Sequence, residues 1–174
     1  MEKIFYTSVN AYPNSETAVL HVFKHFFDMD NMKLIRNENG KPFLSESNRK
    51  LFFSVSHTND VLFIAVSDEN VGIDAESETR NVQYGNIVKK FSTDEKKEIS
   101  TSLDFLIHWT AKESTIKWLG GKILHDLNKL TYAHNQMQYQ NIPLPIRITF
   151  PPFKNYVIAV CSETDFSNAE YIPF

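Results

Sequence analysis

The stretch SVSHTNDVLFIAVSDENVGIDAE, residues 54–76, decides the fold. It begins with two apolar runs separated by Asn59 and Asp60, a pair that favours a turn between strands. A third short run, VGIDAE, follows a second polar turn. Because side chains alternate along a strand, Asp74 and Glu76 share one face of this third run. The stretch therefore predicts a β-hairpin followed by a strand that presents two carboxylates together.

Helical spacing of apolar residues appears on both sides of this stretch. Residues 13–30 and residues 102–121 each predict a long helix, and the second of these ends in two glycines. Between them, Ser92 followed by Glu95 is the pattern of a capping box and predicts a short helix within 91–100.

Further strands are predicted before and after the long helices. Residues 33–44 form two extended pieces around an Asn–Gly turn, and residues 129–134, 146–150 and 155–163 are short apolar runs. The run at 155–163 resembles the one at 61–69, since both contain the letters IAV. The similarity hints at an internal repeat, although any apolar strand could produce it.

The order of these elements predicts an α+β fold. We expect two similar lobes in one chain, related by a pseudo-two-fold axis. Each lobe would hold a small, mostly antiparallel sheet packed with a long helix. The predicted boundary gives an N-terminal lobe at 1–85 and a C-terminal lobe at 86–174, with the functional site at their interface.

Composition narrows the classes of function. The 174 residues are 42% hydrophobic, as expected for a folded globular protein. The net charge of −3 argues against a general nucleic-acid binder. The single cysteine, Cys161, lies in an apolar run and predicts a buried thiol, which fits a reducing cytoplasm. We see neither a signal peptide nor an apolar run long enough to span a membrane, so we expect a cytoplasmic protein.

A third carboxylate, Glu113, lies on the second long helix one turn before Lys117. Taken separately, these residues and the Asp74/Glu76 pair could simply be solvated surface groups. If Asp74, Glu76 and Glu113 converge, each like-charged pair costs about 3 kcal/mol at about 5 Å. A cation would offset that cost, and carboxylate oxygens suit Mg²⁺ or Mn²⁺. A magnesium ion with few protein ligands usually shares its coordination with a phosphate.

Four residues are candidate donors to the oxygens of such a phosphate. Ser56 and His57 end the first strand of the hairpin, Lys41 precedes a proline, and Arg36 lies on a predicted strand. Each could also be an ordinary surface residue.

Several motifs now occur in a recognisable order between residues 36 and 121. They are GKP (40–42), FSVSHT (53–58), GIDAE (72–76), FSTDE (91–95) and WTAKESTIKWLG (109–120). This series resembles the surfactin-type 4′-phosphopantetheinyl transferases. The last motif is the most specific, because W-x-x-K-E-x-x-x-K after G-I-D-x-E rarely arises by chance.

The resemblance implies an activity and its partners. Members of this family transfer the 4′-phosphopantetheine group of coenzyme A to a serine hydroxyl of an apo acyl or peptidyl carrier protein, and release 3′,5′-ADP. It also implies two α+β lobes with the site between them. Because two lobes in one chain complete the site, we expect a monomer with neither a nucleic-acid nor a membrane partner.

The resemblance also assigns roles in catalysis. Asp74, Glu76 and Glu113 would hold Mg²⁺ against the pyrophosphate, and Glu113 would accept the proton of the carrier serine. Lys117 would stabilise charge on the transferring phosphate, and Trp109 would brace the helix that carries Glu113.

Coenzyme A itself would be bound by Ser56, His57, Lys41 and Lys117. Larger members hold the nucleotide with a basic N-terminal stretch, and Arg36 is our candidate for that role here. The carrier would dock on the segment 77–100. Its acidic helix would meet four lysines there: Lys89, Lys90, Lys96 and Lys97.

Two other functions fit parts of the pattern. A metal-dependent phosphodiesterase or nuclease also combines acidic residues with an E…K pair, although the acidic net charge and the GKP and SH elements oppose it. A non-catalytic paralogue that binds a carrier protein would keep the fold without turnover.

Overall fold

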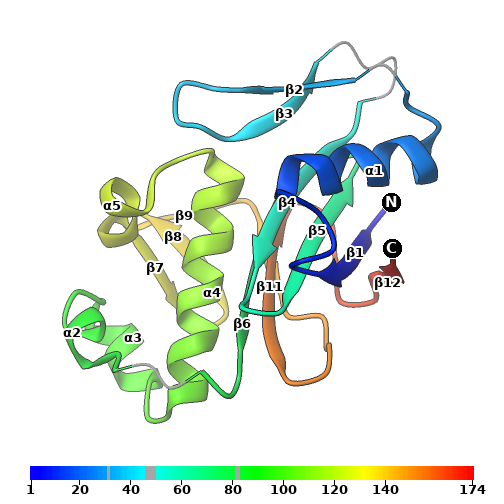
Figure 1. Ribbon diagram of the computed structural model, residues 1–174. Coiled ribbons are helices and arrows are strands. Elements are labelled where there is room, and N and C mark those ends of the chain that lie inside the picture. The colour runs from blue at the N-terminus through cyan, green and yellow to red at the C-terminus, as the bar shows by residue number, and fades with distance from the viewer. Residues whose placement is uncertain (31, 46–49, 81–82) are drawn as a thin grey trace.

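The computed structural model describes residues 1–30, 32–45, 50–80 and 83–174 as a mixed α+β fold (Figure 1). In chain order, the elements are β1 (Lys3–Ser8), α1 (Ser15–Phe27), β2 (Lys33–Arg36), β3 (Pro42–Ser45), β4 (Phe52–His57), β5 (Val61–Ser67), β6 (Val71–Ser77), α2 (Gly85–Val88), α3 (Thr93–Glu98), α4 (Ser102–Leu119), α5 (Ile123–Asp126), the short 3₁₀ helix η1 (Leu127–Lys129), β7 (Leu130–Ala133), β8 (Gln136–Tyr139), β9 (Ile142–Pro143), β10 (Arg147–Thr149), β11 (Tyr156–Ser162) and β12 (Glu170–Pro173).

The first sheet has the strand order β12–β1–β5–β4, and α1 packs against it (Figure 1). Helix α1 begins after Asn14, whose side chain accepts a hydrogen bond from the Thr17 amide at 2.9 Å. Its apolar stripe faces the sheet. The buried core between them includes Phe5, Val19, Val22, Phe23, Phe53, Leu62 and Ile64. Strand β12 pairs in parallel with β1, which brings the two ends of the chain close together.

The second sheet has the order β10–β11–β6, and the long helix α4 lies against β6 and β11. A capping box of Thr101 and Asp104 starts α4, and Gly120 ends it with a φ of 68°. Helix and strand approach very closely at Gly72, where an added Cβ would lie 2.0 Å from the Ser114 carbonyl oxygen. The glycine therefore sets the distance between β6 and α4.

Serine hydroxyls join the two sheets where β4 runs beside β6. The Ile73 amide donates to Ser54 Oγ, and the Ala75 amide donates to Ser56 Oγ, both at 3.1 Å. The two serines thus satisfy amides of β6 on the side away from β11. As a result, the C-terminal ends of β4 and β6, which carry His57 and Glu76, lie near each other.

Two smaller sheets flank this framework. Strands β2 and β3 form a hairpin, and β7, β8 and β9 form a three-stranded antiparallel sheet beside α4. The hairpin lies over the ends of α1 and α4 in Figure 1.

The structure confirms the α+β class and the main predicted elements. These are the helices at 13–30, 91–100 and 102–121, the hairpin within 54–76, and the strands after residue 128. The two main sheets also share an element order, since strand, helix, hairpin and two strands occur in each, with matching orders β1–β5–β4 and β6–β11–β10.

A two-fold axis and a boundary at residue 85 remain predictions. Strand β6 was expected in the N-terminal lobe, yet its ladder partner is β11. Within the described ranges, no helix is both long and apolar enough to cross a membrane.

Candidate active site

Asp74 lies at the centre of the site, on strand β6. It is 5% exposed, and its Oδ1 atom accepts hydrogen bonds from Ser56 Oγ at 2.9 Å and from Lys117 Nζ at 2.8 Å. The Lys117 ammonium also donates to the Ile73 carbonyl oxygen at 2.9 Å. The structure therefore brings together three predicted site residues from three elements: Ser56 of β4, Asp74 of β6 and Lys117 of α4.

Glu113 lies one turn before Lys117 on α4 and is half-buried. Burial and the negative charge of Asp74 raise the pKa of Glu113 to about 8, and the charge of Glu76 raises it further, while Lys117 and Arg80 oppose the shift. These couplings place all three predicted carboxylates in one electrostatic neighbourhood.

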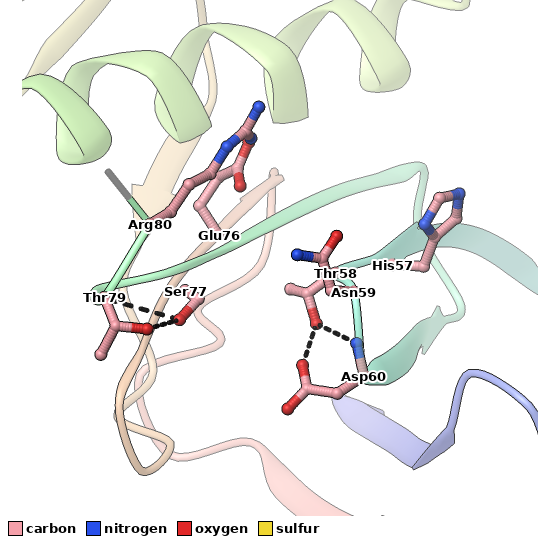
Figure 2. Close-up of a pocket in the computed structure, with 8 residues that line it drawn as sticks. All are labelled: His57, Thr58, Asn59, Asp60, Glu76, Ser77, Thr79 and Arg80. Atoms are coloured by element: carbon pink, nitrogen blue, oxygen red, sulfur yellow. Dashed lines mark hydrogen bonds and ion pairs between the residues drawn. The ribbon is translucent and has the colours of Figure 1, made fainter. Parts of the chain in front are cut away.

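Glu76 is paired with Arg80, which lies four residues further along the chain. Both side chains line an open pocket of about 700 Å³ between the end of β4 and the end of β6 (Figure 2). Its other lining residues are His57, Thr58, Asn59, Asp60, Ser77 and Thr79. His57 is exposed at the end of β4, on the wall opposite Glu76 and Arg80. His57 and Glu76, which were predicted from the stretch 54–76, therefore line the same pocket.

Lys41 and Arg36 lie outside the residues that line this pocket. The Lys41 ammonium donates to Asn70 Oδ1 at 3.0 Å and to the Trp118 carbonyl at 3.2 Å, and burial lowers its pKa to about 8. It lines a second pocket, of about 240 Å³, which Lys117 also lines. Lys117 thus connects the carboxylates to this second pocket.

Arg36 projects from the β2–β3 hairpin. Its guanidinium donates to the Gly40 carbonyl at 2.8 Å and pairs with Glu16 on α1. Its role in binding a nucleotide remains a prediction, because the structure shows a contact with α1 instead.

Comparison with known proteins decides the family. A family model described as the 4′-phosphopantetheinyl transferase superfamily matches residues 70–161, which is more than half of the 174 residues. The chain belongs to this superfamily. The match covers β6 and α4, and therefore Asp74, Glu76, Glu113 and Lys117. The resemblance seen in the sequence motifs is confirmed at this level.

A curated transferase supports the same assignment. The 4′-phosphopantetheinyl transferase gsp of Aneurinibacillus migulanus is 29% identical over 143 residues, covering 76% of this chain and 59% of the relative. The chain therefore spans less than two thirds of the length of this relative.

Two residues of the superfamily-like motif in α4 have structural roles. Trp109 stacks on Phe105 at a centroid distance of 5.9 Å and belongs to an apolar cluster with Phe91, so it braces the helix as expected. Lys112, which precedes Glu113, forms a buried ion pair with Glu95 at 2.8 Å. Its ammonium also lies 4.0 Å from the centre of the Phe91 ring.

Glu95 is fully buried and satisfies three donors. It completes the predicted capping box with Ser92, accepts from the Tyr132 amide at 3.1 Å and pairs with Lys112. The capping box was visible in the sequence. The partnership with Lys112 was not, because it joins residues on two different helices.

The superfamily implies a divalent cation, for which Asp74, Glu76 and Glu113 are the candidate ligands. Three carboxylates within one electrostatic neighbourhood supply oxygen ligands, which fit Mg²⁺. Across the described ranges, however, no three His, Cys, Asp or Glu side chains are arranged as a metal cluster. Asp74 and Glu76 are instead bonded to Lys117 and Arg80. The chemistry of the donors fits the ion, but two of the carboxylates already have cationic partners.

Of the eight residues that line the large pocket, the sequence analysis selected only His57 and Glu76 as candidate site residues. It did not select Thr58, Asn59, Asp60, Ser77, Thr79 and Arg80. A signal for Arg80 was present, since it follows Glu76 by four residues in a polar turn. For Asn59 and Asp60 the sequence indicated a turn and gave no further indication of a pocket.

Proposed function

We propose that this protein is a Mg²⁺-dependent 4′-phosphopantetheinyl transferase. It would transfer the phosphopantetheine group of coenzyme A to a serine hydroxyl of an apo acyl or peptidyl carrier protein, with release of 3′,5′-ADP. One observation carries the proposal. In a chain of this superfamily, Asp74 on β6 is bonded to Lys117 on α4, one turn from Glu113, and Glu76 on the same strand lines an open pocket of about 700 Å³.

The residues present suit a phosphoryl transfer. The serine oxygen forms a new bond to the phosphorus next to the pantetheine arm, and the bond from that phosphorus to the bridging oxygen breaks, so that 3′,5′-ADP leaves. Glu113 would take the serine proton, directly or through a water molecule. The Lys117 ammonium would offset charge on the phosphate oxygens.

The raised pKa of Glu113 bears directly on this role, because the carboxyl must be ionised before it can accept a proton. With Asp74 and Glu76 as neighbours, burial holds the pKa of Glu113 at about 8, so the group is mostly protonated near neutrality. Positive charge at the carboxylates would lower that pKa and leave Glu113 ionised. A Mg²⁺ ion held by the three carboxylates would supply this charge and would neutralise the pyrophosphate oxygens.

His57 and Ser56 support the binding of coenzyme A in different ways. His57 is exposed at the pocket and free to meet a phosphate, whereas the Ser56 hydroxyl is already bonded to Asp74 and to the Ala75 amide. Ser56 would therefore act by orienting Asp74. Lys41 and Lys117, on the second pocket, would meet other phosphates of the same molecule.

The carrier protein would dock beside the large pocket, on the segment 77–100, of which residues 81–82 lie outside the described ranges. Four lysines of this segment are exposed: Lys89, Lys90, Lys96 and Lys97. They would attract an acidic helix of the carrier. We further expect that the protein is a cytoplasmic monomer. We also expect that Mn²⁺ can replace Mg²⁺ in the reaction.

The test is transfer itself. The protein is incubated with coenzyme A, Mg²⁺ and a panel of apo carrier proteins, and intact masses of the carriers are recorded. We expect a gain of one phosphopantetheine group that EDTA abolishes and excess Mg²⁺ restores. Coenzyme A binding without any gain on the panel would favour the non-catalytic paralogue. Cleavage of nucleic acid without a carrier would favour the phosphodiesterase.

Isosteric variants test the assigned residues. Asp74→Asn and Glu113→Gln should lower the rate at least about a hundredfold while the circular dichroism spectrum stays unchanged. Glu163→Gln is the matched control, because Glu163 is an exposed carboxylate outside the residues that line the large pocket. Full activity of Asp74→Asn or Glu113→Gln would refute the mechanism.

A further inference from the structure

Two of the three carboxylates in the site each have a cation of their own. Asp74 bonds to Lys117, and Glu76 bonds to Arg80. The two cations come from different elements, since Lys117 is on α4 and Arg80 follows the end of β6. As a result, both carboxylate charges are neutralised by groups of the chain itself.

Arg80 differs from Lys117 in how firmly it is held. The Lys117 ammonium has two acceptors, Asp74 and the Ile73 carbonyl, and its side chain is 29% exposed. The Arg80 side chain is 54% exposed, and Glu76 is its only ion-pair partner among the described residues. Glu76 is 13% exposed, but more than half of the Arg80 side chain lies in solvent. An ion pair that is open to water on its cationic side contributes about 1 kcal/mol, so it opens readily.

Hydrogen bonds of residues 77–80 hold the turn that carries Arg80. The Arg80 amide donates to the Ser77 carbonyl at 3.0 Å, and the Glu78 amide donates to the Asn155 carbonyl at 2.9 Å. The Ser77 and Thr79 hydroxyls are bonded to each other at 2.8 Å. The turn therefore holds the Arg80 side chain at the wall of the large pocket, whichever partner its guanidinium selects (Figure 2).

From this arrangement, we propose that Arg80 is an internal counterion of Glu76 that a divalent cation displaces, after which its guanidinium binds the pyrophosphate of coenzyme A. The inference rests on the proposed function and adds a residue that binds coenzyme A to it. A divalent cation bound by the carboxylates would repel the Arg80 guanidinium and replace it as the partner of Glu76. The released Arg80 then adds positive charge to the pocket and offers a fork of donors that suits phosphate oxygens.

The proposal predicts opposite effects of one substitution on two ligands. Without coenzyme A, Arg80→Gln should bind Mn²⁺ about tenfold more tightly than the wild type, because the competing charge is gone. With saturating Mg²⁺, the same variant should bind coenzyme A about tenfold more weakly. A residue with a purely structural role would not shift the two affinities in opposite directions.

The measurement uses the full chain without any carrier protein. The protein is treated with EDTA, dialysed and titrated with Mn²⁺, and free Mn²⁺ is measured by electron paramagnetic resonance. The binding of coenzyme A in saturating Mg²⁺ is measured by calorimetry. Arg147→Gln is the matched control, since Arg147 is exposed and its nearest carboxylate, Asp165, is 3.9 Å away on the protein surface. In a Glu76→Gln background, Arg80→Gln should no longer tighten Mn²⁺ binding.

Each result decides a part of the proposal. A Mn²⁺ affinity of Arg80→Gln within twofold of the wild type, or the same increase in the Glu76→Gln background, overturns the counterion role. An unchanged affinity for coenzyme A overturns the anion-binding role. If the Mn²⁺ and coenzyme A shifts occur as expected but no carrier is modified, then the counterion role stands and only the transfer function fails.

Discussion

Gly72 offers the sharpest test of how the fold positions the site, through the substitution Gly72→Ala. A Cβ at this position would lie 2.0 Å from the Ser114 carbonyl oxygen and 2.6 Å from the Trp118 amide nitrogen, both of them backbone atoms of α4. Because neither can rotate away, α4 must retreat by at least about 1 Å to restore a contact of 3.0 Å. Overpacking of this kind costs about 1–3 kcal/mol, and two backbone clashes favour the upper end.

The displacement should affect stability and activity together. A loss of about 3 kcal/mol would lower the melting temperature by about 6–12 °C in a domain of this size. Since α4 carries Glu113 and Lys117 and β6 carries Asp74, a shift of about 1 Å between them should also reduce the transfer rate by about a hundredfold. Urea unfolding and the carrier mass assay measure the two effects.

Gly85→Ala is the matched control for this experiment. Gly85 begins α2, and an added Cβ there meets no atom within 4 Å. We expect a change within about 1 kcal/mol, in the stabilising direction, because alanine lowers the entropy of the unfolded chain. If Gly72→Ala cost less than about 1 kcal/mol, or Gly85→Ala as much as Gly72→Ala, the argument from close approach would be refuted.

Three further predictions concern buried ionisable groups. Removing one partner of the Glu95–Lys112 pair, by Glu95→Ala or Lys112→Ala, should cost about 3–5 kcal/mol in urea unfolding, and the double variant should cost less than the sum; additive losses would contradict the buried pair. In EDTA, the raised pKa of Glu113 means that the folded state binds the extra proton, so stability should fall by up to about 1.4 kcal/mol per pH unit as the pH rises from the ordinary carboxyl range towards about 8. Glu113→Gln should remove that slope, and an identical slope in the variant would exclude Glu113 as its source. Cys161 is 0% exposed, and its burial raises the pKa of the thiol to about 12. The native thiol should therefore resist a disulfide reagent that modifies one thiol per chain in urea. Rapid reaction in the native state would count against its burial.

Local rules of the sequence were enough to predict the elements and part of the site. Strand alternation placed Asp74 and Glu76 on one face, and helical spacing placed Glu113 one turn from Lys117. The capping box at Ser92 was likewise readable, because all of these patterns depend on residues within four positions of one another. Local geometry is fixed by short-range sterics and hydrogen bonding, which the sequence displays directly.

Pairings between distant elements could be recognised only in the folded chain. Nothing near Ser56 in the sequence indicates that its hydroxyl reaches Asp74, and nothing near Lys41 indicates that its ammonium meets the Trp118 carbonyl. Nothing near Lys112 in the sequence indicates that it is buried against Glu95 on another helix. These outcomes depend on how the apolar faces of sheets and helices pack.

The sequence by itself determined the family motifs, the α+β class and the identities of the carboxylates. Tertiary structure alone decided which cation each carboxylate received: Lys117 for Asp74, and Arg80 for Glu76. The physical reason is that the burial of apolar surface fixes the distance between β6 and α4, and charged side chains then pair within the space that remains.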